Sequence, residues 1–546
     1  MSEGYDPTYA TAARVKAPVP DSVDVAIVGA GIGGLVAGAS LARSGLSVAC
    51  FDQHYVAGGC TTQFARGGPS NRFNFDIGLH YIGDCKSEYG VIPEILNELG
   101  VDIEFVDMDQ DGFDTLIFPD FRFRIPASID LYRDRLVEMF PEDRKGIDYY
   151  IKFVRQVDNI GRTMDRAEGR RSLGVLAQVL LRGRSLIKHQ HQTVGELLDH
   201  VTQNPKLRAV LLGQNGDYGL PPSEVSALLH VGLSVHYLRG AYYPKGGGQI
   251  ISDRVSEAME AAGGTVHLRR AVSEIVVESG RVVGVKTQPH KGDPKFVRAK
   301  TVISNADLQR TMLELVTQEA LPTEARRKAE NFKMAAAIAM TCLGVKGDLR
   351  DLGMTNTNYW QFDGYDMESY YKSIRSGGAP EPRCAYITSG SLKDPDCPHH
   401  APEGHQTLEI MTILSGRPED WGLDGVDLDR WGYKRNEVYA AHKARLEENL
   451  IERADNLFPG LKERVVFQES ATPMTHTRYT WATQGTGYGI AATPDQMFKG
   501  RPGYRGPLPG LYFCGASTRA GHGIIGAMQS GRIAAKKVLS DLRSPA

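Results

Sequence analysis

Apolar positions near the start of the chain predict a strand, a turn and a helix. Residues 24–28 form a short apolar run that is typical of a buried strand. The next six residues include four glycines, and apolar residues then recur at helical spacing as far as Leu41. A second apolar run over 46–51 ends at Asp52. Strand, helix and strand in this order predict the beginning of a parallel α/β sheet.

The glycines of this turn have the spacing of a dinucleotide-binding motif. Gly29 suits a tight turn, Gly31 leaves a bare backbone beside a pyrophosphate, and Gly34 permits close packing of the helix on the strand. The helix that follows presents free N–H groups and a partial positive charge to phosphates. Asp52 lies roughly 20 residues beyond Gly29, where a carboxylate accepts hydrogen bonds from a ribose 2′-OH. These features favour FAD or NAD over NADP.

Two more glycine-rich segments lie farther along the chain. A glycine pair, Gly58-Gly59, follows the ribose acid within a few residues, and an NAD dehydrogenase has no need of it. Near the C-terminus a strand-like run over 511–514 leads into Gly515-Ala516, and a glycine-rich turn then opens a helix. Glycines weaken a purely structural helix start, so we expect this turn to approach a ligand.

The middle of the chain alternates between strand and helix patterns. Residues 274–287 indicate a hairpin whose turn lies at 278–280. Residues 86–239 predict mostly helices, whereas 311–499 mix strands with helices. The pattern therefore predicts more than one folding unit.

Length and charge exclude several classes of protein. The chain has 546 residues, enough for two to four units, and 63 basic against 65 acidic residues give a net charge of −2. A nucleic-acid binder should be basic, so we expect no nucleic-acid partner. Seven scattered cysteines do not resemble a disulfide framework and indicate a reducing, cytoplasmic location. Residues 1–21 resemble a polar tail rather than a secretory signal, and no apolar run has the length of a membrane span.

One stretch carries a local excess of positive charge. Between residues 162 and 190, basic side chains interleave with leucine, valine and isoleucine. Such a basic amphipathic segment suits a helix that lies on anionic lipid, although a charged face on a packing helix gives the same pattern. We take a membrane surface as a candidate partner, which would also suit an apolar substrate.

The three glycine-rich segments, together with the sequence FDIGLHYIG over 75–83, resemble the phytoene desaturase, carotenoid isomerase and retinol saturase family within the amine-oxidase-like flavoproteins. Similarity continues over 391–395 and 404–412, among other segments, and covers nearly the whole chain after residue 22. The resemblance implies bound FAD. One residue departs from the pattern, because Cys60 stands where phytoene desaturases usually have arginine.

The resemblance also implies an architecture. We expect an α/β fold in which a Rossmann-type FAD-binding domain is split into three segments, 22–85, 240–310 and 500–546, around one parallel sheet. The intervening segments 86–239 and 311–499 would form a mixed α+β substrate domain. The ligand cleft should lie between the two domains.

The motifs and the resemblance together give a set of cofactor-binding residues. In the family, the residue that matches Val272 contacts the adenine through its backbone, and the Gly-Ala turn lies near the ribityl chain. The predicted cofactor-binding residues are Gly29, Ala30, Gly31, Gly33, Gly34, Asp52, Gly58, Gly59, Thr61, Thr62, Val272, Asn305, Gly515, Ala516, Gly523, Ile524, Gly526 and Ala527.

Three side chains are candidates for chemistry at the flavin. His80 and Tyr81 lie on the segment after the second glycine pair, where a hydrogen-bonded core pair would give the same sequence. His522 lies inside the C-terminal glycine turn, where it could donate a hydrogen bond to the reduced ring or to substrate. Carotenoid-type members need no side-chain base, so all three could serve only to shape the site.

These expectations combine into a leading function and its alternatives. The leading hypothesis is an FAD-dependent oxidoreductase that saturates or desaturates a carbon–carbon double bond in an apolar isoprenoid lipid. One alternative is a redox-neutral cis–trans isomerase, and another is a non-catalytic lipid-binding flavoprotein. An amine oxidase is disfavoured because nothing in the sequence resembles an aromatic cage. Since no second dinucleotide motif is present, we expect a quinone, oxygen or a redox protein as the electron partner.

Remaining cysteines and histidines suggest little further chemistry. Cys397, His399, His400 and His405 form a loose group, but without a CxxC or HExxH pattern we expect no metal. Cys60 could be reactive beside a glycine turn or simply buried, and the apolar neighbours of the last cysteine, at position 514, predict a core residue.

Overall fold

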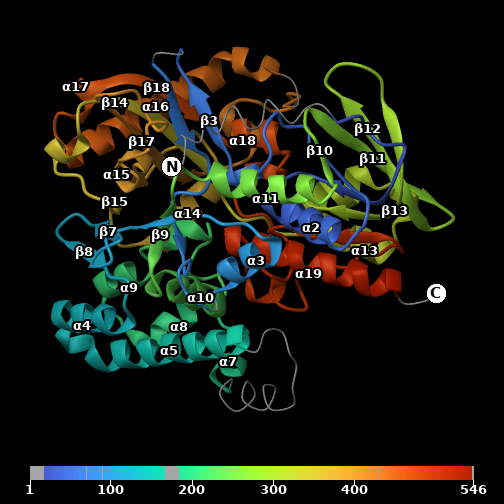
Figure 1. The fold of residues 1–546 in the computed structure, drawn as a ribbon. Helices are drawn as coiled ribbons and strands as arrows, with labels where there is room; N and C mark the ends of the chain where they lie inside the picture. The colour runs from blue at the N-terminus through green and yellow to red at the C-terminus, as the bar shows by residue number, and fades with distance from the viewer. Residues whose placement is uncertain (1–16, 69–70, 89, 167–183, 429–430, 544–546) are drawn as a thin grey trace.

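The chain folds into two sheet-containing lobes and a layer of helices, which a computed structural model describes over residues 17–68, 71–88, 90–166, 184–428 and 431–543 (Figure 1). Strands β10 to β13 lie at the upper right of Figure 1, and β14, β17 and β18 lie at the upper left. Helices α4, α5, α7 and α8 gather below them, on the side away from the hairpin β11–β12. The two seven-stranded sheets are separate units of hydrogen bonding.

The first sheet takes strands from all three segments of the predicted cofactor domain. Its order is β10-β2-β1-β13-β12-β11, and β19 also pairs with β13. Five of these strands are joined by parallel pairings: β1 (Ser22–Val28), β2 (Val48–Phe51), β10 (Thr265–His267), β13 (Lys295–Ser304) and β19 (Leu511–Phe513). Their carboxyl ends therefore meet at one edge, where ligands bind in open α/β sheets.

The expectation of a wholly parallel sheet is wrong at one side. Strands β11 (Arg270–Glu278) and β12 (Arg281–Pro289) form the predicted hairpin, and β12 pairs antiparallel with β13. The turn between them is short, with Ser279 and Gly280 both at positive φ, and a turn this tight can join only antiparallel strands.

Four helices pack beside this sheet and against one another: α2 (Ile32–Arg43), α3 (Val91–Leu99), α11 (Gln249–Ala261) and α19 (Gly523–Arg543). Glycines allow their backbones to approach closely. A Cβ on Gly34 would lie 2.3 Å from the carbonyl oxygen of Gly29, and one on Gly531 would lie 2.1 Å from that of Gly33. The predicted role of Gly34 in helix–strand packing agrees with this contact.

The second sheet has the order β18-β14-β17-β16-β15-β7-β8. It consists of β7 (Asp114–Ile117), β8 (Arg122–Ile125), β14 (Ala337–Lys346), β15 (Asn358–Phe362), β16 (Cys384–Thr388), β17 (His405–Leu414) and β18 (Val465–Ala471). All pairings are antiparallel except that of β7 with β15. Helix α16 (Glu437–Leu457) buries Leu446 and Leu450 in the apolar core of this lobe.

The segment 86–239 supplies the helical layer, as its pattern predicts, but it also contributes β7 and β8 to the second sheet. Its further helices are α4 (Ile129–Met139), α5 (Arg144–Arg166), α7 (Arg184–His189), α8 (Val194–Val201), α9 (Pro205–Leu211) and α10 (Ala227–Leu238). Most of the basic stretch over 162–190 lies outside the described residues. In the described part of the chain, no helix is both long and apolar enough to cross a membrane.

Smaller elements complete the fold. A two-stranded sheet contains β3 (Gln63–Arg66) and β4 (Phe73–Asp76), and a three-stranded one contains β5 (Ile82–Gly83), β6 (Phe105–Asp107) and β9 (Ala241–Pro244). The remaining α-helices are α12 (Leu308–Arg310), α13 (Thr323–Glu330), α14 (Met367–Arg375), α15 (Gly390–Lys393), α17 (Leu461–Arg464) and α18 (Pro473–Thr480).

Candidate functional site

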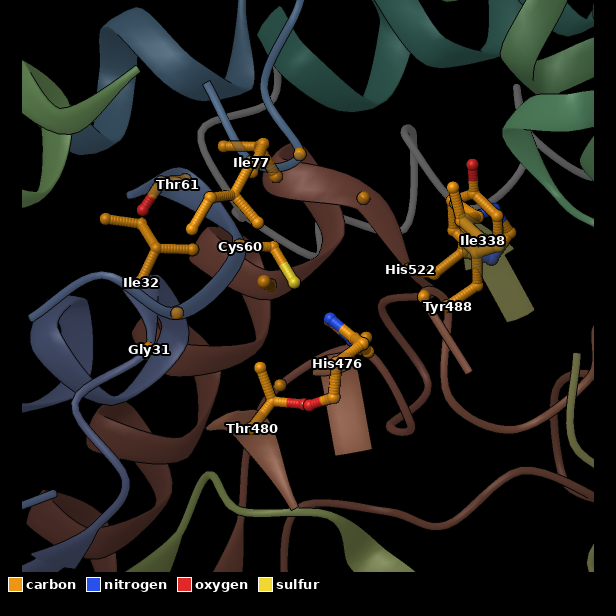
Figure 2. A pocket seen from close by; sticks show the side chains of 18 of the residues that line it. Gly31, Ile32, Cys60, Thr61, Ile77, Ile338, His476, Thr480, Tyr488 and His522 are labelled. Atoms are coloured by element: carbon orange, nitrogen blue, oxygen red, sulfur yellow. The ribbon is translucent and has the colours of Figure 1, made fainter. Parts of the chain in front are cut away.

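A cavity of about 860 Å³ runs from the carboxyl edge of the first sheet to the second sheet and the helical layer. Val28 and Phe51, at the ends of β1 and β2, line it on one side, while Met340 of β14 and Leu229 of α10 line it elsewhere. Figure 2 shows Gly31, Cys60 and Thr61 grouped on one side of this space, with Tyr488 and His522 on the other. The cavity therefore joins both lobes.

The glycine turn after β1 is built as the motif predicts. Gly29 has φ of +94°, in the left-handed region that favours glycine. The carboxylate of Asp52 accepts hydrogen bonds at 2.7 Å from the backbone N–H of Ala30 and of His54. Helix α2 begins at Ile32, so its first N–H groups, which have no acceptor within the helix, lie where the turn meets the cavity.

Asn305 explains part of the glycine requirement. Its side chain donates to the carbonyl oxygen of Gly29 at 3.3 Å, and a Cβ on Gly31 or Gly33 would lie 2.6 Å from its amide group. These glycines are therefore needed for protein packing as well as for access to a ligand. A Cβ on Gly33 would also lie 2.9 Å from the carbonyl oxygen of Ala527, in the C-terminal segment.

Most of the predicted cofactor residues share this cavity. Those that line it are Gly29, Gly31, Gly33, Asp52, Gly58, Gly59, Thr61, Thr62, Val272, Asn305, Gly515, Ala516, Gly523, Ile524 and Ala527. Ala30, Gly34 and Gly526 do not line it. For Gly34 and Gly526 the structural reason is close packing, since a Cβ on Gly526 would lie 2.4 Å from the carbonyl oxygen of Gly521. We call six of the glycines that line the cavity, at positions 29, 31, 33, 58, 59 and 515, the glycine wall.

A buried arginine holds the C-terminal turn, and sequence reasoning missed it. Arg501 is 1% exposed and donates to the carbonyl oxygens of Thr518 and Ala516, at 2.8 and 2.7 Å. Ser530 of α19 accepts a hydrogen bond from the backbone N–H of Gly515 at 2.6 Å. These contacts hold the backbone of the turn at the edge of the cavity. They do not use the side of the turn that faces the cavity.

The three predicted catalytic side chains all line the cavity. Burial, together with the charge of Lys393, lowers the pKa of His80 to about 3, and burial with the charge of Arg501 lowers that of His522 to about 3. Both rings are therefore neutral near pH 7. Nε2 of His80 is buried and, among the described residues, has no hydrogen-bond partner.

Tyr81 belongs to a buried acidic network that the sequence did not reveal. Its hydroxyl lies 2.7 Å from Oδ2 of Asp217 and 3.3 Å from Oδ2 of Asp114. Burial, with the neighbouring charge of Asp114, raises the pKa of Asp217 to about 8, and burial raises that of Asp114 to about 6. Asp217 therefore keeps its proton at neutral pH and lines the cavity.

Aromatic rings gather around this network and form what we call the aromatic wall: Tyr81, Tyr237, Trp360 and Tyr386. The Tyr81 and Tyr237 rings stack with centroids 4.1 Å apart, and Trp360 meets Tyr386 edge-on at 4.4 Å. No local pattern in the sequence indicates such a cluster, because its members are far apart in the chain.

Aliphatic side chains from three helices continue the cavity into the helical layer, and we call them the apolar lining: Val157, Leu186, Leu228, Leu229 and Leu233. Ile338, Met340 and Met411 extend the apolar surface onto the second sheet. Apolar walls with a few convergent polar groups are typical of ligand cavities.

Other side chains clarify or extend the predictions. Burial raises the pKa of Cys60, which disfavours a reactive thiolate, and Cys514 is 4% exposed in the core. His476 and Thr480 of α18 line the cavity near Cys60 in Figure 2, although no motif singled them out. All seven cysteines are free.

Comparison with known proteins identifies the family. The model of the flavin-containing amine oxidoreductases matches residues 32–539. The chain belongs to this family. The predicted flavoprotein superfamily and α/β class are thus confirmed, and a flavin is the cofactor that the family description names.

Relatives of known name cover nearly the full chain. An all-trans-retinol 13,14-reductase of Danio rerio is 28% identical, covering 86% of this chain and 78% of its own length. A prolycopene isomerase of an Oncidium hybrid cultivar is 24% identical and covers 96% of this chain and 85% of its own length. The solved structure of an oxidoreductase from Methanosarcina mazei aligns with a TM-score of 0.61 at 17% identity, covering 95% of this chain and all of the other.

The residues present fit a flavin dinucleotide. The glycine wall places backbone without side chains on the cavity, and Asp52 lies directly after β2, where a ribose acceptor is expected. The unpartnered Nε2 of His80 supplies a buried polar atom on the same cavity. The carboxyl edge of the first sheet therefore offers the groups that such a cofactor would need.

Proposed function

We propose that this protein is an FAD-dependent oxidoreductase that saturates or desaturates a carbon–carbon double bond of an apolar polyene lipid. The observation that carries the proposal is the continuity of one cavity from the glycine wall to the apolar lining. The named relatives support it, because all-trans-retinol and prolycopene are both polyenes.

The chain supplies binding groups for each part of the cofactor. Asp52 would hold the adenosine ribose, and the N-terminus of α2 would face the diphosphate. Helix α19, which begins at Gly523 on the cavity, would direct its positive end toward the ring. FAD supplies, when bound, a donor or acceptor of hydride for the double bond.

Asp217 is suited to hold the proton that accompanies hydride transfer. Its protonated carboxyl lines the cavity and is hydrogen-bonded to Tyr81 at 2.7 Å. His80 and His522 remain neutral, so they contribute hydrogen bonds and shape rather than an acidic proton. The apolar lining would exclude water and orient the chain of a polyene along the cavity.

One observation favours redox-neutral isomerisation as a second candidate. Burial and the neighbouring charge of Asp114 raise the pKa of Tyr81 well above its usual value. Tyr81, His80 and His522 therefore do not change their protonation near neutral pH. A site of this kind can bind a polyene while one of its double bonds rotates, with no net transfer of a proton. A non-catalytic lipid-binding role would leave the acidic network without a purpose.

The electron partner and location complete the proposal. A quinone, oxygen or a redox protein would exchange electrons with the flavin, in a cytoplasmic protein that meets its lipid substrate at a membrane surface. Rapid stoichiometric bleaching of the flavin by NADPH alone would contradict this part of the proposal.

The deciding experiment is anaerobic incubation of the oxidised and the photoreduced protein with all-trans-retinol and with a carotenoid mixture, followed by mass spectrometry. A product that gains or loses two hydrogens supports the redox proposal and gives its direction. Unchanged mass with altered retention supports isomerisation. No product with any polyene would overturn both.

A further inference from the structure

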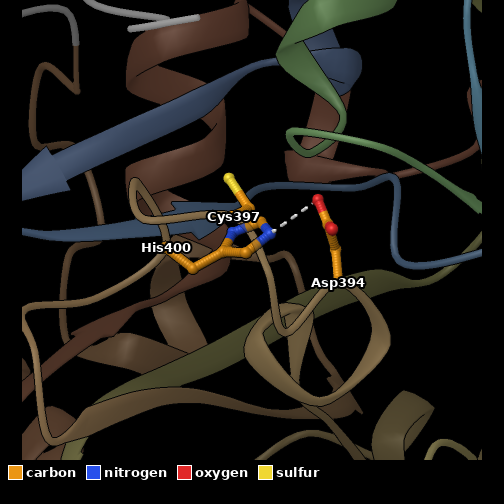
Figure 3. A group of neighbouring side chains, drawn as sticks. All are labelled: Asp394, Cys397 and His400. Atoms are coloured by element: carbon orange, nitrogen blue, oxygen red, sulfur yellow. Dashed lines mark ion pairs between the residues drawn. The ribbon is translucent and has the colours of Figure 1, made fainter. Parts of the chain in front are cut away.

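The loop between α15 and β17 gathers three metal-binding side chains that the cavity does not use. Asp394, Cys397 and His400 follow one another at a spacing of three residues. Figure 3 shows the Asp394 carboxylate facing the His400 ring across an ion pair, with Cys397 beside the ring. One ligand atom from each lies within 4.8 Å of the other two, and Asp394 and His400 are buried while Cys397 is half-buried.

The side chains lie close enough to share a cation. Nε2 of His400 makes an ion-pair contact with Oδ2 of Asp394 at 3.6 Å, and this buried nitrogen has no hydrogen-bond partner among the described residues. Two ligands at about 2.0–2.1 Å from a tetrahedral zinc ion lie about 3.4 Å apart. Small adjustments would thus bring both atoms onto one ion.

Backbone contacts already orient two of these residues. The N–H of Gly246 donates to Oδ2 of Asp394 at 2.7 Å, and the N–H of Asn74, on β4, donates to the carbonyl oxygen of His400 at 2.9 Å. The amide of Asn74 also donates to the carbonyl oxygen of His399. The first contact orients the carboxylate of Asp394, as hydrogen bonds to the ligands of metal sites do, and the other two hold the backbone of the loop.

We propose that Asp394, Cys397 and His400 hold a zinc ion, with water as the fourth ligand beside the half-buried Cys397. Carboxylate, thiolate and imidazole together suit zinc and exclude calcium and magnesium, which take oxygen ligands. His405, which sequence reasoning grouped with this segment, lies outside the site. Its Nδ1 lies 2.9 Å from the carbonyl oxygen of Glu403, and its ring packs on Phe73.

On binding, zinc would take a thiolate from Cys397 and a neutral imidazole from His400, and any proton that these groups carry would pass to solvent.

The position of the site indicates a structural role. Lys393, the residue before Asp394, donates from Nζ to the carbonyl oxygen of His80 at 2.5 Å. Zinc on the loop would fix the end of α15 and, through it, the His80 segment at the cavity. This inference is independent of the reaction that the flavin performs.

Metal content of the untagged holoprotein tests the site. After dialysis against zinc and removal of free metal, we expect about one equivalent of zinc per chain by plasma mass spectrometry. Cys397→Ser and His400→Gln should lose it, whereas the matched controls Cys85→Ser and His405→Gln should retain it. Zinc should also raise the melting temperature of the wild type and the controls, but not of the two site variants.

Wild-type protein provides a second test that does not depend on folding of the variants. Alkylation of Cys397, followed by peptide mapping, should slow at least about tenfold when zinc is present, because the thiolate is the ligand. Cobalt in place of zinc should give a thiolate charge-transfer absorption. Less than about a tenth of an equivalent of zinc, or alkylation of Cys397 unchanged by zinc, would overturn the proposal. Neither readout depends on turnover of a polyene.

Discussion

The glycine wall is made of backbone, whereas the aromatic wall across the same cavity is made of side chains. At Gly33, atoms of three residues from two distant segments lie within 3.2 Å of the position that a Cβ would take. At the aromatic wall, stacked rings and the acid Asp217 meet through side-chain contacts. A wall made of backbone tolerates almost no added atom, whereas a wall made of side chains can change with the ligand. Under the proposed function, the lobe of the first sheet can therefore keep its cofactor while the rest of the cavity changes its substrate.

A side chain in the glycine wall should have the largest effect. In Gly33→Val the branched side chain would meet Asn305, Ala527 and Gly515, so we expect the flavin content to fall more than about tenfold. Flavin absorbance per chain measures it. The control Gly364→Val adds the same atoms where nothing lies within 4 Å of a Cβ. Full flavin content in Gly33→Val would show that the wall is more adaptable than its contacts indicate.

Removing the acid behind the aromatic wall should leave the cofactor in place but slow the reaction. Asp217→Asn keeps the shape yet cannot supply a proton, so we expect turnover to fall about 100-fold with unchanged flavin content. Single-turnover oxidation or reduction with a polyene measures it. Asp120→Asn, an acid that pairs with Lys206 at the surface, should leave the rate unchanged. Equal rates in both variants would remove Asp217 from the mechanism.

Filling the apolar lining should act on substrate alone. In Leu229→Trp the larger ring would occupy space along the cavity, and we expect KM for a long carotenoid to rise about tenfold with little change in flavin content. Steady-state kinetics with a short and a long polyene measure it. Leu131→Trp, on an exposed part of α4, is the control. A uniform loss for both substrates would place the polyene elsewhere.

Replacing a histidine of the cavity should have the smallest effect, and this effect is on the free energy of unfolding. The pKa of His522 is lowered to about 3 from 6.5, so between these pH values the unfolded chain binds more protons than the folded one. The free energy of unfolding should therefore fall as pH falls through this window, by at most about 1.4 kcal/mol per pH unit for this group. Denaturant titrations of the wild type and of His522→Gln at pH 7 and pH 5.5 test it. The variant should lose less stability, and equal losses would contradict the shift.

How well a structural feature can be predicted from the sequence depends on how far apart in the chain its interacting residues lie. Gly29 and Asp52 belong to one local motif. That motif predicts the strands that precede both residues and their position at the edge of the cavity. Asp217 and Arg501 carry no local pattern, because their roles arise only when segments far apart in the chain pack together. Asp394 lacks a sequence signal for another reason: the cysteine and histidine spacings of metal motifs contain no carboxylate, and only the fold brings that of Asp394 near Cys397 and His400.

Strand β19 and helix α19 impose an order of events on the newly made chain. β19 adds to β13 of the first sheet, and α19 packs on α2 so closely that Gly531 meets Gly33. The lobe of the first sheet therefore cannot close until β19 and α19 have left the ribosome, although β1 is made long before them. During synthesis the half-built sheet exposes an unpaired edge, so chaperones should hold this protein longer than a protein whose domains are continuous in sequence.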